Sequence, residues 1–195
     1  MKIDKVLIYG SSHFSQVICE YLLAHSDYQL VGYIPSHRPT IEGKMPIPQV
    51  SVNVEHNIKL SLQYNKRILE IDNAYNVHTG LLPEYGGRDI FAHTIKNKEY
   101  QQGLTLHKMT DQYDHGPIIS KITYPVFEED TPLSLYERQL HVAPPFVCAA
   151  LDLLGSLSKK EMLNCFKQTP TMYKRTHKLS PSFAKYKERL ENESS

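Results

Sequence analysis

Apolar residues gather in short runs near the start of the chain, and each run ends at small or polar residues. Residues 6–9 (Val-Leu-Ile-Tyr) stop at residues 10–12 (Gly-Ser-Ser), and residues 30–34 form a second run of this kind. Between the two runs, the apolar residues of segment 17–22 recur at helical spacing. The pattern predicts a buried strand, an amphipathic helix and a second buried strand, which is how an open parallel sheet begins.

The next segment changes character. Residues 35–50 contain four prolines and are expected to form a loop. Residues 57–63 then alternate apolar and polar side chains, which predicts a strand with one wetter face. Only about two dozen residues separate this strand from the one before it, so the intervening β-α unit is expected to be abbreviated.

The second half of the chain continues the alternation of strands and helices. A short helix is expected over residues 90–97, and a long helix begins at Thr131 and Pro132, which are a good N-cap and a good first helical residue. Pro144 and Pro145 are expected to kink or restart that helix. Further strands are predicted over residues 72–78, 103–109 and 117–124.

This order of elements predicts an α/β fold. We expect a Rossmann-like, twisted, mostly parallel sheet with helices on both faces. Residues 1–155 would form the main domain. Residues 156–195 are more polar and would form a C-terminal extension, helical in part.

Composition excludes several classes of protein. The chain has 195 residues, 41% of them hydrophobic and 22% charged, as in ordinary globular proteins. A net charge of +1 argues against a nucleic-acid partner. No apolar stretch approaches the ~18 residues of a membrane span, and no signal peptide is recognisable. Cys19, Cys148 and Cys165 are an odd, widely spaced set, which we interpret as reduced thiols in a cytoplasmic protein.

Polar side chains that suit acyl-transfer chemistry gather where strands should end. Asn76 and His78 are two residues apart on an extended segment and therefore point to the same side. An amide donor and an imidazole together suit oxyanion stabilisation and proton transfer. Asp111 and Asp114 are the nearby carboxylates that could complete the set. Taken alone, this spacing is more typical of a turn with capping polar groups than of a catalytic site.

Two other kinds of site have less support. The chain has 10 histidines, but no pair has convincing zinc spacing, so no metal is expected. The turn at residues 10–12 lacks a G-x-G-x-x-G fingerprint, so a dinucleotide is not indicated. That turn either places backbone N–H groups for a phosphate at a helix start or is a plain β-α turn.

Two linked motifs carry a resemblance to a known family. Residues 76–87 (Asn-Val-His-Thr-Gly-Leu-Leu-Pro-Glu-Tyr-Gly-Gly) resemble the signature N-x-H-[PTG]-[SG]-L-L-P-x-Y-x-G of the folate-dependent formyltransferases. Residues 103–107 and 114–118 resemble the G-[VTL]-[TS]-[VLI]-H strand and D-x-G-P-[IV] loop of that family. The strong resemblance covers residues 57–125. Two departures are the Thr79-Gly80 pair, where Pro-Ser is more frequent, and the short segment between residues 35 and 57.

The resemblance implies the catalytic set Asn76, His78 and Asp114, with N10-formyltetrahydrofolate as the formyl donor. Asp111 matches a position that is not catalytic in the family. Segments 63–69 and 110–114 would enclose the pterin ring. The implied donor-binding residues are Gln63, Tyr64, Lys66, Arg67, Ile68, His107, Thr110 and Asp111. The implied acceptor-binding residues are Gly10, Ser11, Ser12, His13, Phe14 and Gly87.

The acceptor is less well defined, because the family includes enzymes that formylate amino-sugar nucleotides, glycinamide ribonucleotide and methionyl-tRNA. Residues 10–15 resemble the G-[ST]-x-x-F turn of the sugar and tRNA branches, and the chain is too short for the C-terminal domain of the tRNA enzymes. Segment 110–114 resembles the purine enzyme. We expect a small-molecule acceptor, a nucleotide-linked amino-deoxysugar. Phosphoribosylglycinamide is the alternative, and a non-catalytic folate- or nucleotide-binding module is a second one. A homodimer is left open.

Overall fold

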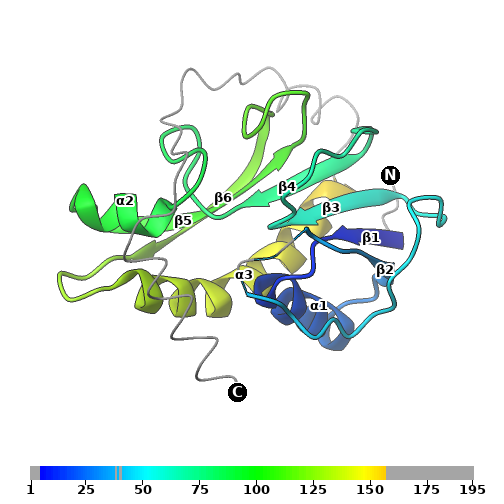
Figure 1. Ribbon diagram of the computed structural model, residues 1–195, viewed down its shortest axis with the longest axis horizontal. Coiled ribbons are helices and arrows are strands. Elements are labelled where there is room, and N and C mark those ends of the chain that lie inside the picture. The colour runs from blue at the N-terminus through cyan, green and yellow to red at the C-terminus, as the bar shows by residue number, and fades with distance from the viewer. Residues whose placement is uncertain (1–4, 38, 40, 157–195) are drawn as a thin grey trace.

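A computed structural model describes residues 5–37, 39 and 41–156. Within these residues, six strands form one sheet in the order β2-β1-β3-β4-β5-β6, accompanied by three helices (Figure 1). The strands are β1 Lys5–Tyr9, β2 Gln29–Ile34, β3 Ile58–Leu62, β4 Ala74–His78, β5 Gln101–Lys108 and β6 Ile118–Pro125. The helices are α1 His13–His25, α2 Ile90–Lys96 and α3 Pro132–Ser156.

The sheet is parallel on one side and antiparallel on the other. Strand β1 pairs in parallel with β2 and β3, and β3 pairs in parallel with β4. Strands β4 and β5 are antiparallel, as are β5 and β6. The carboxyl ends of β1, β3 and β4 therefore lie along one edge, where ligands of open α/β sheets bind. The expected α/β fold with a mostly parallel sheet is confirmed.

Helices α1 and α3 cover one face of this sheet (Figure 1). The main core forms there, where Val6 and Ile8 of β1 meet Phe14 and Ile18 of α1 and Val147 of α3, all essentially buried. These positions follow the alternation of a strand and the 3.6-residue period of a helix, which is why the sequence pattern located them.

The short helix α2 packs at the far end of the same face. Phe91 meets Tyr136 of α3 edge-to-face, with ring centroids 6.2 Å apart. The Thr94 hydroxyl accepts a hydrogen bond of 2.8 Å from the Gln102 amide at the start of β5. These contacts join α2 to both α3 and the antiparallel half of the sheet.

Loops, and no helix among the described residues, cover the second face. Leu7 and Tyr9 of β1 pack there against Ile68 and Tyr64, with Met109 beside them. The structure therefore differs in one respect from the expectation of helices on both faces. No described residue between β2 and β3 is helical, and the loops after β3 and β5 pack on this face instead.

The expectation of a wetter face on β3 is wrong, because loops bury the polar positions of this strand. All five residues of β3 are buried, including Lys59 and Ser61. The Lys59 ammonium donates a 2.9 Å hydrogen bond to the Glu70 carbonyl, which satisfies one of its donors inside the fold. The alternation reflects which face meets helices and which meets loops.

Helix α3 begins as the sequence predicts. The Thr131 hydroxyl accepts a 3.2 Å hydrogen bond from the Ser134 N–H, and Pro132 is the first helical residue. Pro144 and Pro145 lie inside the helix, which runs from residue 132 to 156 without a break.

Residues 157–195 of the C-terminal extension, Cys165 among them, lie outside the described residues. Cys19 and Cys148, which are described, are free thiols. In the described part of the chain, none of the helices has the length and apolar character needed to cross a membrane.

Candidate active site

Asn76 and His107 meet where β4 and β5 pair. The antiparallel register places these two residues opposite each other. The Asn76 Nδ2 atom lies 3.1 Å from His107 Nε2, and His107 Nδ1 lies 3.0 Å from the Lys108 carbonyl oxygen. Because a carbonyl only accepts, the His107 proton sits on Nδ1 and Nε2 accepts from the Asn76 amide. The Asn76 side chain is thereby oriented, with its second N–H still available.

His107 is held in its neutral form. Burial, reinforced by the adjacent His78 ring, lowers the pKa of His107 to about 4. The Asp114 carboxylate and the Lys108 carbonyl oppose this effect but do not cancel it. At neutral pH His107 therefore serves as an acceptor for Asn76.

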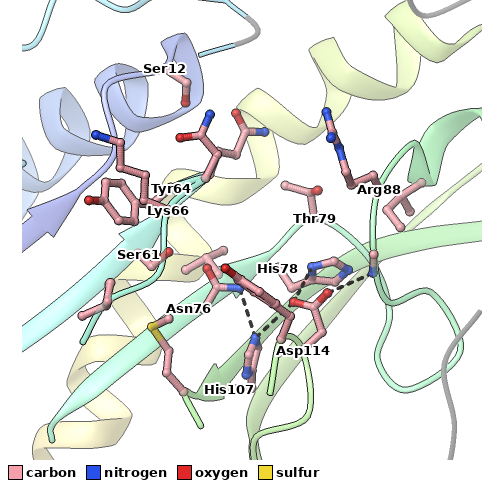
Figure 2. Close-up of a pocket in the computed structure, with 18 of the residues that line it drawn as sticks. Ser12, Ser61, Tyr64, Lys66, Asn76, His78, Thr79, Arg88, His107 and Asp114 are labelled. Carbon is pink, nitrogen blue, oxygen red and sulfur yellow. Dashed lines mark hydrogen bonds and ion pairs between the residues drawn. The ribbon is translucent and has the colours of Figure 1, made fainter. Parts of the chain in front are cut away.

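His78 lies between two acceptor oxygens. Its Nδ1 atom is 3.4 Å from Asp114 Oδ1 (Figure 2). Its Nε2 atom is 2.6 Å from the Tyr85 carbonyl oxygen. The Gly87 N–H donates a 2.9 Å hydrogen bond to Asp114 Oδ2, which fixes the carboxylate from the other side. The side chains of His78 and Asp114 are largely buried, at 7% and 16% exposure. This arrangement suits an imidazole that gains a proton during a reaction, because each N–H would face an acceptor.

The loop after β5 brings Asp114 to this position. Asp114 itself has a positive φ of 57°, in the left-handed region. A Cβ atom on Gly116 would lie 1.4 Å from the Lys108 carbonyl oxygen, so only glycine permits the loop to return this closely to β5. The structure brings together Asn76, His78 and Asp114 as the sequence motifs suggested (Figure 2).

A cavity of about 590 Å³ opens beside these side chains, a volume that suits a small-molecule site. Every residue expected to bind the donor lies in its wall: Gln63, Tyr64, Lys66, Arg67, Ile68, His107, Thr110 and Asp111. His107 lies in β5, and the others come from the loops after β3 and β5.

The residues expected to bind the acceptor are divided between the cavity and the fold. Ser12 and Gly87 line the cavity. Ser11 accepts a 3.1 Å hydrogen bond from the Ser36 N–H, and Phe14 is fully buried in the main core. Gly10 precedes them in the turn after β1, and His13 is the first residue of α1.

Sequence patterns missed a further part of the cavity wall. Phe91 of α2 and Tyr136 of α3 pack against each other, yet both also line the cavity. Ser61 lines it from near the end of β3. In the sequence, the only sign that these three residues belong to the site is that each lies near the end of a helix or strand, and the fold brings those ends together. Thr79, Arg88, Ile41 and Tyr113 also line the cavity.

The described residues hold no group of three or more histidine, cysteine, aspartate or glutamate side chains placed to bind a metal ion. The cavity instead presents an amide, an imidazole and a carboxylate to whatever it binds. Those groups donate and accept hydrogen bonds and move protons.

Comparison with known proteins concerns the segment that carries these side chains. Residues 66–151 match the family described as formyl transferase, a segment that contains Asn76, His78 and Asp114. This formyl transferase segment reaches from the loop after β3 into α3.

Two curated relatives carry similar sequences. The chain is 37% identical over 82 residues to the bifunctional polymyxin resistance protein ArnA of Wigglesworthia glossinidia brevipalpis, covering 38% of this chain and 12% of the relative. It is 24% identical over 166 residues to a methionyl-tRNA formyltransferase of Streptococcus pyogenes serotype M6, covering 69% of this chain and 53% of the relative. The chain thus spans about half the length of the methionyl-tRNA formyltransferase and a much smaller share of the polymyxin resistance protein.

Solved structures of formyl transferases share the fold. One is an N-formyltransferase from Helicobacter canadensis in complex with folinic acid and dTDP-3-aminofucose (TM-score 0.66, 20% identity, 91% of this chain and 75% of that one). Another is the phosphoribosylglycinamide formyltransferase of Bacillus halodurans (TM-score 0.65, 19% identity, 85% of this chain and 100% of that one).

Proposed function

We propose that this protein transfers a formyl group from N10-formyltetrahydrofolate to the amine of a nucleotide-linked amino-deoxysugar. The observation that carries the proposal is the juxtaposition of Asn76, His78 and Asp114 at the wall of one cavity. His78 Nδ1 lies 3.4 Å from Asp114 Oδ1, a separation that leaves room for a substrate oxygen to share the imidazole proton.

The donor would lie between the loops after β3 and β5. These loops supply an aromatic ring and an aliphatic side chain, Tyr64 and Ile68, together with backbone polar groups. A flat, polar-edged ring such as a pterin suits such a slot. Its formyl group would then face the ends of β4 and β5, where the three catalytic side chains meet.

The acceptor amine would attack the formyl carbon. The free N–H of Asn76 and the protonated His78 would stabilise the oxyanion of the tetrahedral intermediate. As the new C–N bond forms, the amine loses a proton. Asp114 would pass it, through water, to the folate N10 when the old C–N bond breaks. The products are the formamide and tetrahydrofolate, and no covalent enzyme intermediate is required.

A sugar-nucleotide acceptor is supported by the shape and lining of the cavity away from the donor loops. Phe91, Tyr136 and Ile41 form an apolar wall there, while Ser12 stands at the start of α1. A deoxysugar with a methyl group would contact the apolar wall.

Phosphoribosylglycinamide formyltransferase is a second candidate, favoured by one specific observation. The structural alignment with the Bacillus halodurans enzyme covers 100% of that chain, whereas it covers 75% of the Helicobacter canadensis sugar enzyme. The compact size of the purine enzymes is therefore matched more closely.

A direct competition assay tests the proposal. The protein is incubated with N10-formyltetrahydrofolate and an equimolar mixture of glycinamide ribonucleotide and dTDP-linked 3-amino- and 4-amino-dideoxysugars. Tetrahydrofolate release is followed by absorbance and the formylated product is identified by mass spectrometry. We expect formylation of an amino sugar and none of glycinamide ribonucleotide.

The control is His78→Ala, which removes the imidazolium proposed to stabilise the oxyanion while its neighbours stay in place. Preferential formylation of glycinamide ribonucleotide would select the second candidate. Binding of the folate donor without turnover of any amine, in wild type and variant alike, would indicate a folate-binding module in place of an enzyme.

A further inference from the structure

Tyr85 connects His78 to the end of helix α2. Its carbonyl oxygen lies 2.6 Å from His78 Nε2, and its hydroxyl donates a 2.5 Å hydrogen bond to Glu99 Oε1. The Asn97 amide donates a second hydrogen bond, of 3.0 Å, to the same hydroxyl. One residue thus contacts the histidine through its backbone and the helix end through its side chain.

The backbone around Tyr85 is fixed by contacts with β5. The Thr105 hydroxyl, which is fully buried, donates to the Gly80 carbonyl at 2.8 Å and accepts from the Leu82 N–H at 3.1 Å. The Tyr85 N–H donates to the Leu81 carbonyl at 2.8 Å. The segment is packed closely enough that a Cβ atom on Gly80 would lie 2.5 Å from the Tyr85 carbonyl oxygen.

The position of Glu99 is fixed by the way α2 ends. Lys98 has a positive φ of 53°, and its N–H donates to the Ile95 carbonyl at 3.0 Å, while the Glu99 N–H donates to the Thr94 carbonyl at 3.0 Å. This pair of hydrogen bonds around a left-handed residue is a Schellman motif. The Glu99 carboxylate therefore has a defined place beside the Tyr85 hydroxyl.

The hydroxyl is the donor in this pair. Burial, with a contribution from Glu99, raises the pKa of the Tyr85 hydroxyl, although the Asn97 amide opposes the effect. The tyrosine remains protonated, and Glu99 accepts. Among the residues described, neither Tyr85 nor Glu99 belongs to the wall of the cavity, so substitutions there remove no direct contact with a bound donor.

The geometry points to Tyr85 and Glu99 as positioning residues for His78. The hydrogen bond between their side chains holds the Tyr85 carbonyl against His78 Nε2, so that Nε2 carries a proton in every protonation state. Nδ1 is then the atom that faces Asp114 and the reacting group. This inference rests on the proposed function only in giving His78 a catalytic role. The orientation of the ring is a separate, measurable property.

Steady-state kinetics test the catalytic consequence. Tyr85→Phe and Glu99→Ala each remove the hydrogen bond, and each should lower kcat about tenfold with the KM for the donor unchanged, since a typical hydrogen bond contributes about one factor of ten. Glu99→Gln retains an acceptor and should stay near wild type. The double variant Tyr85→Phe/Glu99→Ala should lose no more than either single variant, because both remove one interaction.

Tyr100→Phe is the matched control, because the neighbouring Tyr100 side chain is 75% exposed and its hydroxyl should be dispensable. Unchanged kcat in both Tyr85→Phe and Glu99→Ala would overturn the catalytic part of the inference. A loss in Glu99→Gln as large as in Glu99→Ala would also overturn it, because the acceptor would then be irrelevant.

Nitrogen-15 NMR of histidine-labelled protein reads the ring directly. In its neutral form, wild-type His78 should show a protonated Nε2 and an unprotonated Nδ1. Tyr85→Phe should show a mixture of the two tautomers in a protein that is still folded by its amide spectrum. If the wild-type protein transfers no formyl group while these tautomers still differ, the proposed function fails and the positioning role stands. Identical spectra in wild type and Tyr85→Phe would overturn the positioning role, whatever the activity.

Discussion

The Asn76 side-chain amide donates to His107 Nε2 across 3.1 Å, from one strand of the sheet to its antiparallel neighbour. The same histidine donates its Nδ1 proton to the backbone of Lys108. A neutral, buried histidine thus determines which side of the amide carries its N–H groups. The remaining N–H of Asn76 is left to a ligand in the cavity, which is the geometry that an oxyanion donor requires.

We predict that Asn76→Ala lowers kcat on the order of 10²–10³-fold, about 3–4 kcal/mol, because one oxyanion donor is lost. The KM for the folate donor should change little, since the interaction forms mainly in the transition state. Steady-state kinetics on the folded variant, with donor binding measured by titration calorimetry, provide the check. A kcat near the wild-type value with intact donor binding would mean that the oxyanion is held elsewhere.

The same kinetics reveal whether the site acts as a unit. His78→Ala should lose about 10²–10⁴-fold in kcat, the usual range for a proton-transfer group. The double variant Asn76→Ala/His78→Ala should lose less than the product of the two single losses. Fully multiplicative losses would indicate that the amide and the imidazole act independently.

We predict that the free energy of unfolding falls as pH drops from about 6.5 towards 4, in part because of His107. Burial lowers the pKa of folded His107 to about 4, below its value of about 6.5 in an unfolded chain. Because the pKa of His107 is lower in the folded protein than in the unfolded chain, its contribution to the free energy of unfolding is fully present above the unfolded pKa. That contribution is lost as the pH falls from the unfolded pKa to the folded one. The loss should reach the order of 2–3 kcal/mol at pH 4.

Urea unfolding of wild type and His107→Gln at several pH values isolates this contribution. Glutamine keeps a side-chain acceptor for Asn76 but has no titratable proton. The stability advantage of the wild type at pH 7 should shrink steadily as the pH falls to 4. A difference that stays constant over this range would show that His107 does not titrate in the folded protein with a lowered pKa.

We predict that Lys98→Gly stabilises the fold. Lys98 is exposed and has a φ of 53° at the end of α2, where glycine avoids the steric cost that other residues have in left-handed backbone. The gain should be roughly 0.5–1 kcal/mol, or a rise of about 1–4 °C in Tm.

Lys96→Gly is the matched control for this prediction, because Lys96 is also exposed but lies in the last helical position of α2. Glycine there should cost roughly 0.5–1 kcal/mol. Differential scanning fluorimetry of the two variants gives shifts of opposite sign if the left-handed residue determines the result. A drop in Tm for Lys98→Gly would mean that the lysine side chain contributes a contact larger than the backbone strain.

The sequence predicted which side chains meet at the candidate site better than it predicted what covers each face of the sheet. Asn76 and His78 could be placed on one side of a strand because side chains alternate along an extended backbone. Asp114 could be added from the resemblance, and the structure brings it 3.4 Å from His78. By contrast, the alternation in β3 wrongly suggested a wet face, because periodicity does not distinguish water from a covering loop.

Long-range contacts explain what could not be predicted. The Tyr85–Glu99 hydrogen bond joins a loop to a helix end, and no local pattern signals it. Phe91 and Tyr136 look like ordinary core residues in the sequence, and only the packing of α2 on α3 turns part of each towards the cavity. Phe14 was assigned to the acceptor site from a motif, whereas its side chain is fully buried among the residues of the main core.

The loops on the second face of the sheet have a double role that bears on laboratory evolution. Tyr64, Ile68 and Met109 line the cavity and also pack on Leu7 and Tyr9 of β1. The rings of Tyr9 and Tyr64 meet edge-to-face, with centroids 5.1 Å apart. Variants selected for a different donor specificity at these positions will therefore also change resistance to heat. A library built here will need to be screened for both properties at once.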